Sequence, residues 1–255
     1  MKKIILLFAV AVVAFGCKSD DDSNNTPTNA AVAFKFTQNW GGAEVTPSNF
    51  NTGVYENAAG NFVSISRLRY LISRVVLHKE DGTSVAFEGY NLIDLDDANS
   101  LNFNPSTTAT TGHYTGISFV YGFNEQDNSS GAYLDLNAAD WNWPSMLGGG
   151  YHFMQMDGTF DDTNGAPQPY NFHNGTARVS EGVFEQNFLT FDFDQNFTIT
   201  DDATIEIKMD ISEWYKNPLT WDLNERSIDL MMDYIAQKDM NRNGKTVFSI
   251  GAITQ

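Results

Sequence analysis

Apolar and polar residues alternate with a period of two along most of the chain. Residues 204–211 carry isoleucine or methionine at every second position and charged residues between them, and residues 189–194 alternate in the same way. Alternation of this kind is typical of a β-strand with one buried face. We therefore predict an all-β protein. Further strand candidates lie at residues 62–77, 90–95, 114–121 and 151–156.

Only one segment has clear helical spacing. Apolar residues recur on one helical face within residues 226–238, after Asn224 and Ser227 as possible N-caps. The chain shows no internal repeat and no interdomain linker. We therefore predict a single antiparallel β-sandwich over residues 31–255, with long loops and one or two short helices.

Residues 1–16 have the form of a lipoprotein signal peptide. Lys2 and Lys3 precede an apolar stretch that is too short to cross a bilayer, and small residues stand just before Cys17. We expect lipidation of Cys17, with an ordinary secretory signal as the alternative. We predict that residues 17–30 form a disordered tether. Their acidic run resembles the export signal of Bacteroidetes surface lipoproteins, so we expect a cell-envelope protein, held in the outer membrane by its lipid and exposed at the surface.

Charge and cysteine content limit the chemistry that is open to the chain. The 32 acidic residues outnumber the 15 basic residues, which leaves a net charge of -17 and makes nucleic acid an unlikely partner. The single cysteine excludes an intrachain disulfide and a thiolate metal cluster. A metal site would therefore use histidine, methionine, carboxylate or aromatic side chains.

Signatures of catalysis are missing from the sequence. It contains no G-x-S-x-G, H-E-x-x-H, C-x-x-C, Walker A or G-x-G-x-x-G pattern, so we do not expect an enzyme. Residues 239–244 resemble the first half of an EF-hand loop, but Ile250 stands where a bidentate glutamate belongs, which favours a polar turn before the last strand. A structural calcium ion bound by the acidic residues at 94–97 or 161–164 is a weaker alternative.

The most informative stretch is residues 140–175, which hold two of the four histidines and three of the eight methionines. If the strand candidate there forms, His152, Met154 and Met156 project to one face. An antiparallel return of the chain could bring His173 beside His152. Imidazole together with thioether favours copper. The alternative is that the methionines fill the core and the histidines bond to backbone groups.

Segments along the whole chain match one protein family. They lie at residues 63–73, 77, 81–82, 90–94, 112–119, 121–124, 141–143, 150–153, 157–158 and 172–175. The specific part is the trio W-x-W, G-Y-x-F and F-H-x-G. On these residues the chain resembles the MbnP-like copper-binding family in its Bacteroidetes form. These are periplasmic or surface proteins associated with di-haem oxidases of the methanobactin system.

The resemblance implies a β-sandwich that binds one copper ion through histidine. In some members a tryptophan also helps to bind the copper. The di-haem, cytochrome c peroxidase-like partner has oxidised this tryptophan to kynurenine. Position by position, His173 of F-H-x-G is the first ligand candidate and His152 the second. The reserve ligand is His113, and the residues expected to tune the metal or undergo oxidation are Trp141, Trp143 and Met154. The loop at 144–149 is longer than in other members.

A second hypothesis comes from a different class of protein. An acidic, aromatic-rich sandwich on a lipid tether also suits a surface glycan-binding or adhesion module, with Trp40, Trp141 or Trp143 stacking on sugar rings. Histidines 152 and 173 within about 4 Å of each other would favour copper binding, because imidazoles that share a metal must approach closely. A flat row of exposed tryptophans would favour the glycan hypothesis.

Overall fold

The computed structural model describes residues 28–255. The signal peptide, Cys17 and most of the predicted tether lie outside the described residues. Strand β1 (Asn29–Trp40) begins two residues before the predicted domain boundary at 31. Its first residues belong to the fold because Asn29 pairs with Thr110 and Ala30 pairs with Ala109.

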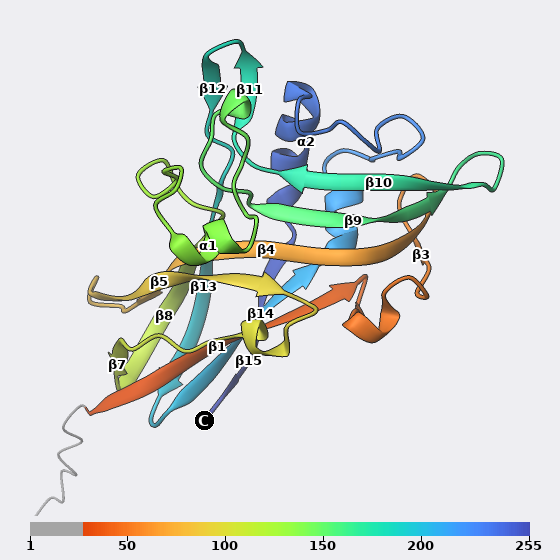
Figure 1. Ribbon diagram of the computed structural model, residues 1–255. Coiled ribbons are helices and arrows are strands. Elements are labelled where there is room, and N and C mark those ends of the chain that lie inside the picture. The colour runs from red at the N-terminus through yellow and green to blue at the C-terminus, as the bar shows by residue number, and fades with distance from the viewer. Residues whose placement is uncertain (1–27) are drawn as a thin grey trace, which may run out of the picture.

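Two sheets pack face to face, which confirms the predicted all-β sandwich (Figure 1). The larger sheet has the order β10-β9-β4-β8-β13, with β3 and β5 also paired to β4, and the smaller has the order β15-β14-β1-β2, with β6 and β7 also paired to β1. The larger sheet contains β3 (Tyr55–Glu56), β4 (Phe62–His78), β5 (Ser84–Asp94), β8 (Gly112–Tyr121), β9 (Met154–Asp161), β10 (Pro167–Asn174) and β13 (Leu189–Ile199). The smaller contains β1, β2 (Ala43–Glu44), β6 (Asn102–Phe103), β7 (Thr108–Thr110), β14 (Ala203–Asp210) and β15 (Phe248–Thr254). A separate hairpin joins β11 (Ala177–Ser180) and β12 (Val183–Glu185).

The alternating residues meet in one aromatic core between the sheets. Along β14, every second residue from Ala203 to Met209 is buried, as the sequence pattern predicts. Phe36 of β1 and Tyr70 of β4 meet across the interface with ring centroids 6.4 Å apart. Phe119 of β8 contacts Phe248 of β15 at 5.5 Å. Burial of such large side chains is the main source of stability in a sandwich.

One strand pair departs from the antiparallel expectation. Strands β1 and β14 run parallel, in a register from Val32 opposite Ala203 to Asn39 opposite Asp210. Parallel neighbours require a long crossover connection. Here the crossover consists of most of the domain, including the whole larger sheet.

Two α-helices accompany the sheets, α1 (Leu134–Ala138) and α2 (Tyr234–Gly244). The helix predicted at 226–238 was placed too early, because the N-cap is Asp233, whose carboxylate accepts a hydrogen bond from the Ala236 amide. Of the apolar residues that suggested the earlier start, Ile228, Met232 and Ile235 are exposed and Met231 is half-buried, so they do not form a buried helical face. No helix within residues 28–255 is long and apolar enough to cross a membrane.

The EF-hand-like stretch is helical and forms the second half of α2. Asp239 is buried there and pairs with Arg226 and Arg242. The expectation of a polar turn was therefore also wrong, because α2 continues to Gly244 before the chain enters β15. A carboxylate held by two guanidinium groups inside a helix is not arranged to bind calcium.

Four short 3-10 helices complete the elements. They are η1 (Pro47–Asn49), η2 (Ala98–Leu101), η3 (Ser145–Leu147) and η4 (Ile211–Tyr215). Of these, η3 lies in the long loop at 144–149, next to the hairpin that carries the paired tryptophans.

Candidate metal site

The two faces of β9 carry different chemistry. Met156 lies opposite Phe172 of β10 and Leu68 of β4, and all three are fully buried in the core. Residues directly opposite each other in antiparallel strands share a face. His173 is opposite Gln155 and therefore lies on the other face of the sheet, away from the core.

The expectation that His152 shares a face with Met154 and Met156 was wrong. Strand β9 starts only at Met154, and Phe153 and Met154 are both buried in the main core, so the alternation breaks between them. The Phe153 amide donates to the Asn174 carbonyl at 2.7 Å, which holds this bend in place. His152 consequently lies on the histidine side of the sheet, and Met154 faces the core instead of tuning a metal there.

The side chains of His152 and His173 lie together at the edge of the larger sheet. Their ring centroids are 5.6 Å apart and the ring planes are nearly perpendicular, at 80°. An ion about 2.0 Å from a ring nitrogen lies about 3.2 Å from the ring centroid, so two imidazoles on one ion have centroids about 5.2–6.4 Å apart for ligand angles from tetrahedral to linear. The observed separation falls within that interval.

Each imidazole has one nitrogen held by an acceptor, which leaves the other nitrogen free to bind. His152 Nδ1 lies 3.2 Å from the Trp141 carbonyl oxygen, and His173 Nε2 lies 2.8 Å from Oδ1 of Asp157. Because a carbonyl and an ionised carboxylate only accept, both of these nitrogens carry the proton. In the neutral rings, Nε2 of His152 and Nδ1 of His173 then hold lone pairs. Orientation of a ligand histidine by a carboxylate or carbonyl is the usual second layer of a metal site.

The electrostatics set the protonation states of His152 and Asp157. Burial is the main cause that lowers the pKa of His152 to about 3, and the neighbouring His173, Arg69 and Arg67 act in the same direction. Burial acts to raise the pKa of Asp157, but hydrogen bonds from His173 and Asn171 and the charge of Arg67 outweigh it and lower the pKa to about 2. At neutral pH His152 is uncharged and Asp157 is ionised.

The two tryptophans of W-x-W flank His152 through a short hairpin. The Trp143 amide donates to the Gly150 carbonyl and the His152 amide donates to the Trp141 carbonyl, both at 2.9 Å. Since alternate residues of an extended chain share a side, both indoles lie beside the imidazole. Ring centroids are 5.4 Å apart for Trp141 and His152 and 4.9 Å apart for Trp143 and His152.

The two indoles differ in their polar contacts. Trp143 Nε1 donates to the Leu147 carbonyl in the long loop. Trp141 Nε1 is buried and has no hydrogen-bond partner within the part of the chain that the structure describes. The guanidinium of Arg69 lies over the Trp141 ring, 5.0 Å from its centroid. Trp214 Nε1 in the core shares this lack of a partner among the described residues, so the difference between Trp141 and Trp143 lies in the contact of Trp143 with Leu147.

The F-H-x-G segment has a distinct structural role at each position. Phe172 packs into the core against Trp221, with ring centroids 4.9 Å apart. His173 points to the opposite face. Gly175 must lack a side chain because a Cβ there would lie 2.5 Å from the indole of Trp143. The segment therefore joins the core, the histidine pair and the tryptophan hairpin.

Sequence reasoning missed three residues that hold His173 in place. Asp157 accepts from its ring and is itself paired with Arg67. Gln237 of α2 donates to the His173 carbonyl at 2.8 Å, and its side-chain oxygen accepts from the Gly175 amide at 3.2 Å. A signal for Asp157 was available. The tight turn that follows Asp161 sets the register of β9 and β10 and places His173 opposite Gln155. Asp157 is two residues beyond Gln155 and therefore lies on the same face of the sheet as His173.

His113 does not join the histidine pair, so its assignment as reserve ligand was wrong. Along β4, Arg69 is level with Gln155 and His173, whereas His78 pairs with Gly116, and His113 lies beyond that point. Arg69 and His78 are about 30 Å apart at roughly 3.3 Å per residue of strand. The exposed His113 instead lines a shallow cavity with Lys79, Glu80 and Asp81.

The acidic loops considered for calcium use their carboxylates locally. Asp94 pairs with Arg69, Asp97 accepts from the Asn99 amide, and Asp162 accepts from the amides of its own turn. Within residues 28–255 no group of three or more His, Cys, Asp or Glu side chains is placed to hold a metal ion. A metal at the histidine pair would therefore have two strong protein ligands of these types.

The tryptophans do not form a surface for sugars. All five are buried, and the most exposed, Trp40, is only 8% exposed. The row of exposed tryptophans that would favour glycan binding is therefore not present.

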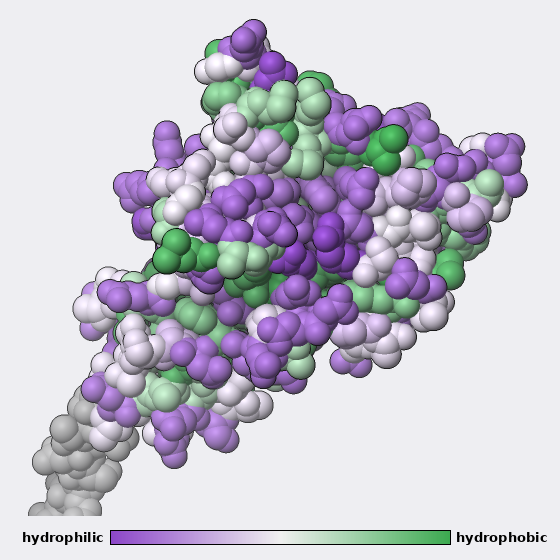
Figure 2. Space-filling model, viewed as in Figure 1, coloured by the Kyte–Doolittle hydropathy of each residue, from purple (hydrophilic) through white to green (hydrophobic). Residues whose placement is uncertain are grey.

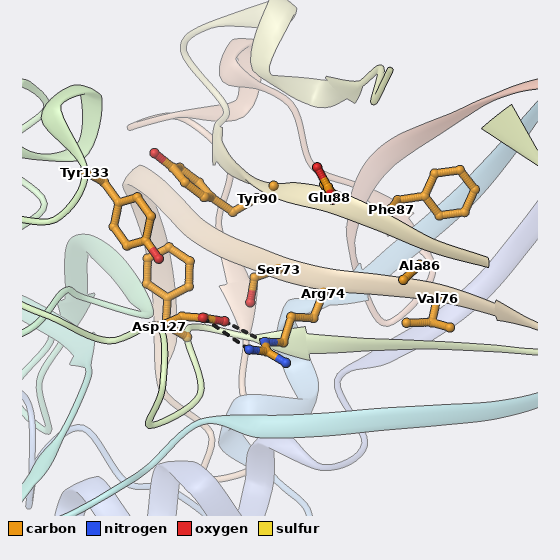
Figure 3. Close-up of a pocket in the computed structure, with 11 residues that line it drawn as sticks. Ser73, Arg74, Val76, Ala86, Phe87, Glu88, Tyr90, Asp127 and Tyr133 are labelled. Atoms are coloured by element: carbon orange, nitrogen blue, oxygen red, sulfur yellow. Dashed lines mark hydrogen bonds and ion pairs between the residues drawn. The ribbon is translucent and has the colours of Figure 1, made fainter. Parts of the chain in front are cut away.

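An aromatic cavity of about 450 Å³ lies elsewhere on the larger sheet, beside Tyr90 and Tyr133 (Figure 3). These two rings pack edge-to-face with centroids 4.8 Å apart, and Arg74 is paired with Asp127. Tyr90, Tyr133, Arg74 and Asp127 thus contact one another within the lining of this cavity.

The fold and the site together define an all-β sandwich with a pair of neighbouring histidines, one buried and one partly buried, between a tryptophan hairpin and an ion-paired carboxylate. The MbnP family model matches residues 29–232, and the chain belongs to this family. The solved structure of MbnP from Methylosinus trichosporium has the same fold. It is 14% identical, with a TM-score of 0.55, over 88% of this chain and 99% of that one. A search of curated proteins finds no matching sequence.

Proposed function

We propose that this protein binds one copper ion between Nε2 of His152 and Nδ1 of His173. Membership of the MbnP family suggests a methanobactin- or copper-related role. The observation that supports copper binding most directly is the arrangement of the pair. Two imidazoles lie at a separation that suits one ion, and each is oriented by an acceptor on its other nitrogen.

The donor set favours copper over zinc. Structural zinc sites use four protein ligands and catalytic zinc sites use three, commonly with thiolate or carboxylate among them. Here the described residues offer two imidazoles and no such third group. Copper accepts imidazole nitrogen readily and stands at the top of the affinity order for such ligands. We propose that the copper is cargo for acquisition or electron transfer, and that the protein binds it without an enzymatic activity of its own.

The surrounding residues orient the ligands and exclude water. Asp157 and the Trp141 carbonyl fix the two rings, while Trp141 and Trp143 cover His152, which is 6% exposed. The same two indoles are the candidates for tuning the metal or for oxidation by a di-haem partner. Trp141 differs from Trp143 in that its Nε1 has no hydrogen-bond partner among residues 28–255.

We also place the protein in the cell envelope, as a lipoprotein anchored through Cys17. The support is the sequence at residues 1–17. Cys17→Ser should move the protein from the membrane fraction to the soluble fraction. Unchanged partitioning into detergent would contradict the anchor.

The copper proposal is tested by native purification with metal analysis and intact mass, followed by equilibrium competition for copper. His152→Ala and His173→Ala should each lower copper affinity at least tenfold, about 1.4 kcal/mol. His78→Ala and His113→Ala are matched controls, because both side chains lie away from the pair, and they should bind copper as the unaltered protein does. Full copper binding by both of the first two variants would refute the proposal.

A further inference from the structure

A groove of about 490 Å³ leads from the surface to His173. One wall comes from the long loop at 144–149 and the other from the segment just before α2. His173 lines its floor together with Asn171 of the same strand. Apolar patches interrupt the mostly polar surface above β10 in Figure 2, where the segment leading into α2 passes in Figure 1.

Three of the eight methionines line this groove, namely Met146, Met231 and Met232. Methionine in a protein usually fills gaps in a core. These three do not, since Met146 is 62% exposed, Met232 is 56% exposed and Met231 is half-buried. The methionines that do serve as core filler, including Met154 and Met156, are fully buried.

The composition of the walls distinguishes the groove from a general apolar surface. Apart from the thioethers it is lined by Pro144, Leu147, Leu230, Asn171, His173 and Asp229. The thioether sulfur is a soft ligand that selects copper(I) over harder divalent ions. Three thioethers around one opening therefore offer a copper(I) ligand set that is independent of the imidazoles.

We infer that the groove is a second copper(I) site, formed by the thioethers of Met146, Met231 and Met232, through which the ion reaches His173. This inference rests on the proposed copper function of the histidine pair. The groove site binds less tightly than the imidazoles and exchanges with solvent, because two of its three methionines are exposed. Copper(I) enters there and passes to the pair.

The test uses the full chain labelled with ¹³C at the methionine methyl groups. Copper(I) is diamagnetic, so anaerobic titration with copper(I) can be followed by methyl NMR. Signals of Met146, Met231 and Met232, assigned by single Met→Leu substitutions, should shift on binding, whereas those of Met154 and Met156 should not. Silver(I), a soft diamagnetic ion, should shift the same three signals, and zinc should leave them unchanged.

Variants separate this inference from the proposed function. The double variant H152A/H173A should still show the three methionine shifts with copper(I). The triple variant M146L/M231L/M232L removes the sulfurs at nearly constant volume, a type of swap that usually costs less than about 1.5 kcal/mol. It should keep the histidine-bound copper and weaken binding of the second copper(I) equivalent at least tenfold.

Two outcomes overturn the inference, and they differ in what else they overturn. If copper binds at the histidines but none of the three methyl signals moves, the groove site is wrong and the proposed function stands. If no copper binds to the folded protein at all, both are wrong. Folding of every variant is checked by near-ultraviolet circular dichroism.

Discussion

Nε2 of His173 lies 2.8 Å from Oδ1 of Asp157, and the same carboxylate is ion-paired with Arg67. The three groups form a chain across β4, β9 and β10, in which the guanidinium holds the carboxylate and the carboxylate holds the imidazole. His173 is 13% exposed at its side chain, so its orientation is set by these contacts more than by solvent. The free nitrogen of the ring is thereby fixed as Nδ1.

Replacement of Asp157 should weaken copper binding without removing a ligand. Asp157→Asn keeps the shape but loses the negative charge that raises the basicity of the ring, so copper affinity should fall about 10- to 100-fold. Asp161→Asn, on the same strand and exposed, is the matched control. Competition titration measures the change, and equal affinities for the two variants would show that Asp157 plays no part.

The pH dependence of stability should report the burial of His152. Its pKa is lowered from 6.5 to about 3 in the folded protein, so the unfolded chain binds the proton more tightly. The stability that comes from keeping the ring neutral is complete above pH 6.5 and is lost as the pH falls from there towards 3. Between pH 7 and 4.5 this amounts to about 2.5 kcal/mol.

Urea unfolding of the metal-free protein at a series of pH values measures this loss. His152→Gln should show a flatter profile over the same window, because it has no group to titrate. Asp157 acts in a different window, since its pKa is lowered from 3.8 to about 2 and its contribution is lost only as the pH falls from 3.8 towards 2. Identical profiles for the two proteins above pH 4.5 would contradict the burial of a neutral imidazole.

A methyl group at position 175 should disturb the tryptophan hairpin. Gly175→Ala places a Cβ 2.5 Å from the Trp143 indole, and overpacking of this kind costs about 1–3 kcal/mol. Copper affinity should fall with it, because Trp143 lies against His152. The control is Gly165→Ala, where the Cβ has open space and the positive φ of 74° alone costs about 1 kcal/mol. Unaltered copper affinity in Gly175→Ala would show that the tryptophan hairpin does not contribute to copper binding.

The Gln237 side chain should stabilise the backbone on either side of Asn174, at His173 and Gly175. Gln237→Leu leaves the His173 carbonyl and the Gly175 amide without their partner in a buried place, which should cost about 2–4 kcal/mol. Gln168→Leu, at an exposed position, should cost little. Hydrogen exchange at the Gly175 amide is the direct measurement. Protection equal to that of the unaltered protein would show that the glutamine is dispensable.

Local patterning was enough to predict the strands and the closeness of the two histidines. The alternation in β14 needs only its own residues, because one face of the strand meets the core and the other meets solvent. The return of the chain that places His173 near His152 follows from a hairpin with a short turn. Both features depend on neighbours in the sequence.

The details that were wrong depend on residues far away in the chain. The bend at Phe153, which separates His152 from Met154, is held by hydrogen bonds to Leu71 and Asn174. The start of α2 is the exception, because it depends on a local cap at Asp233, three residues before Ala236. Periodicity registers neither the tertiary contacts at Phe153 nor this cap.

The parallel pairing of β1 with β14 also sets an order for folding. Strand β1 pairs along most of its length with β14, which is synthesised only after the whole larger sheet, so this pairing cannot form until then. The histidine pair forms later still, because Gln237 of α2 donates a hydrogen bond to the His173 carbonyl. Such non-local pairing makes folding slow. The smaller sheet therefore cannot be completed until β14 has been synthesised, and the histidine site is completed only once α2 has followed.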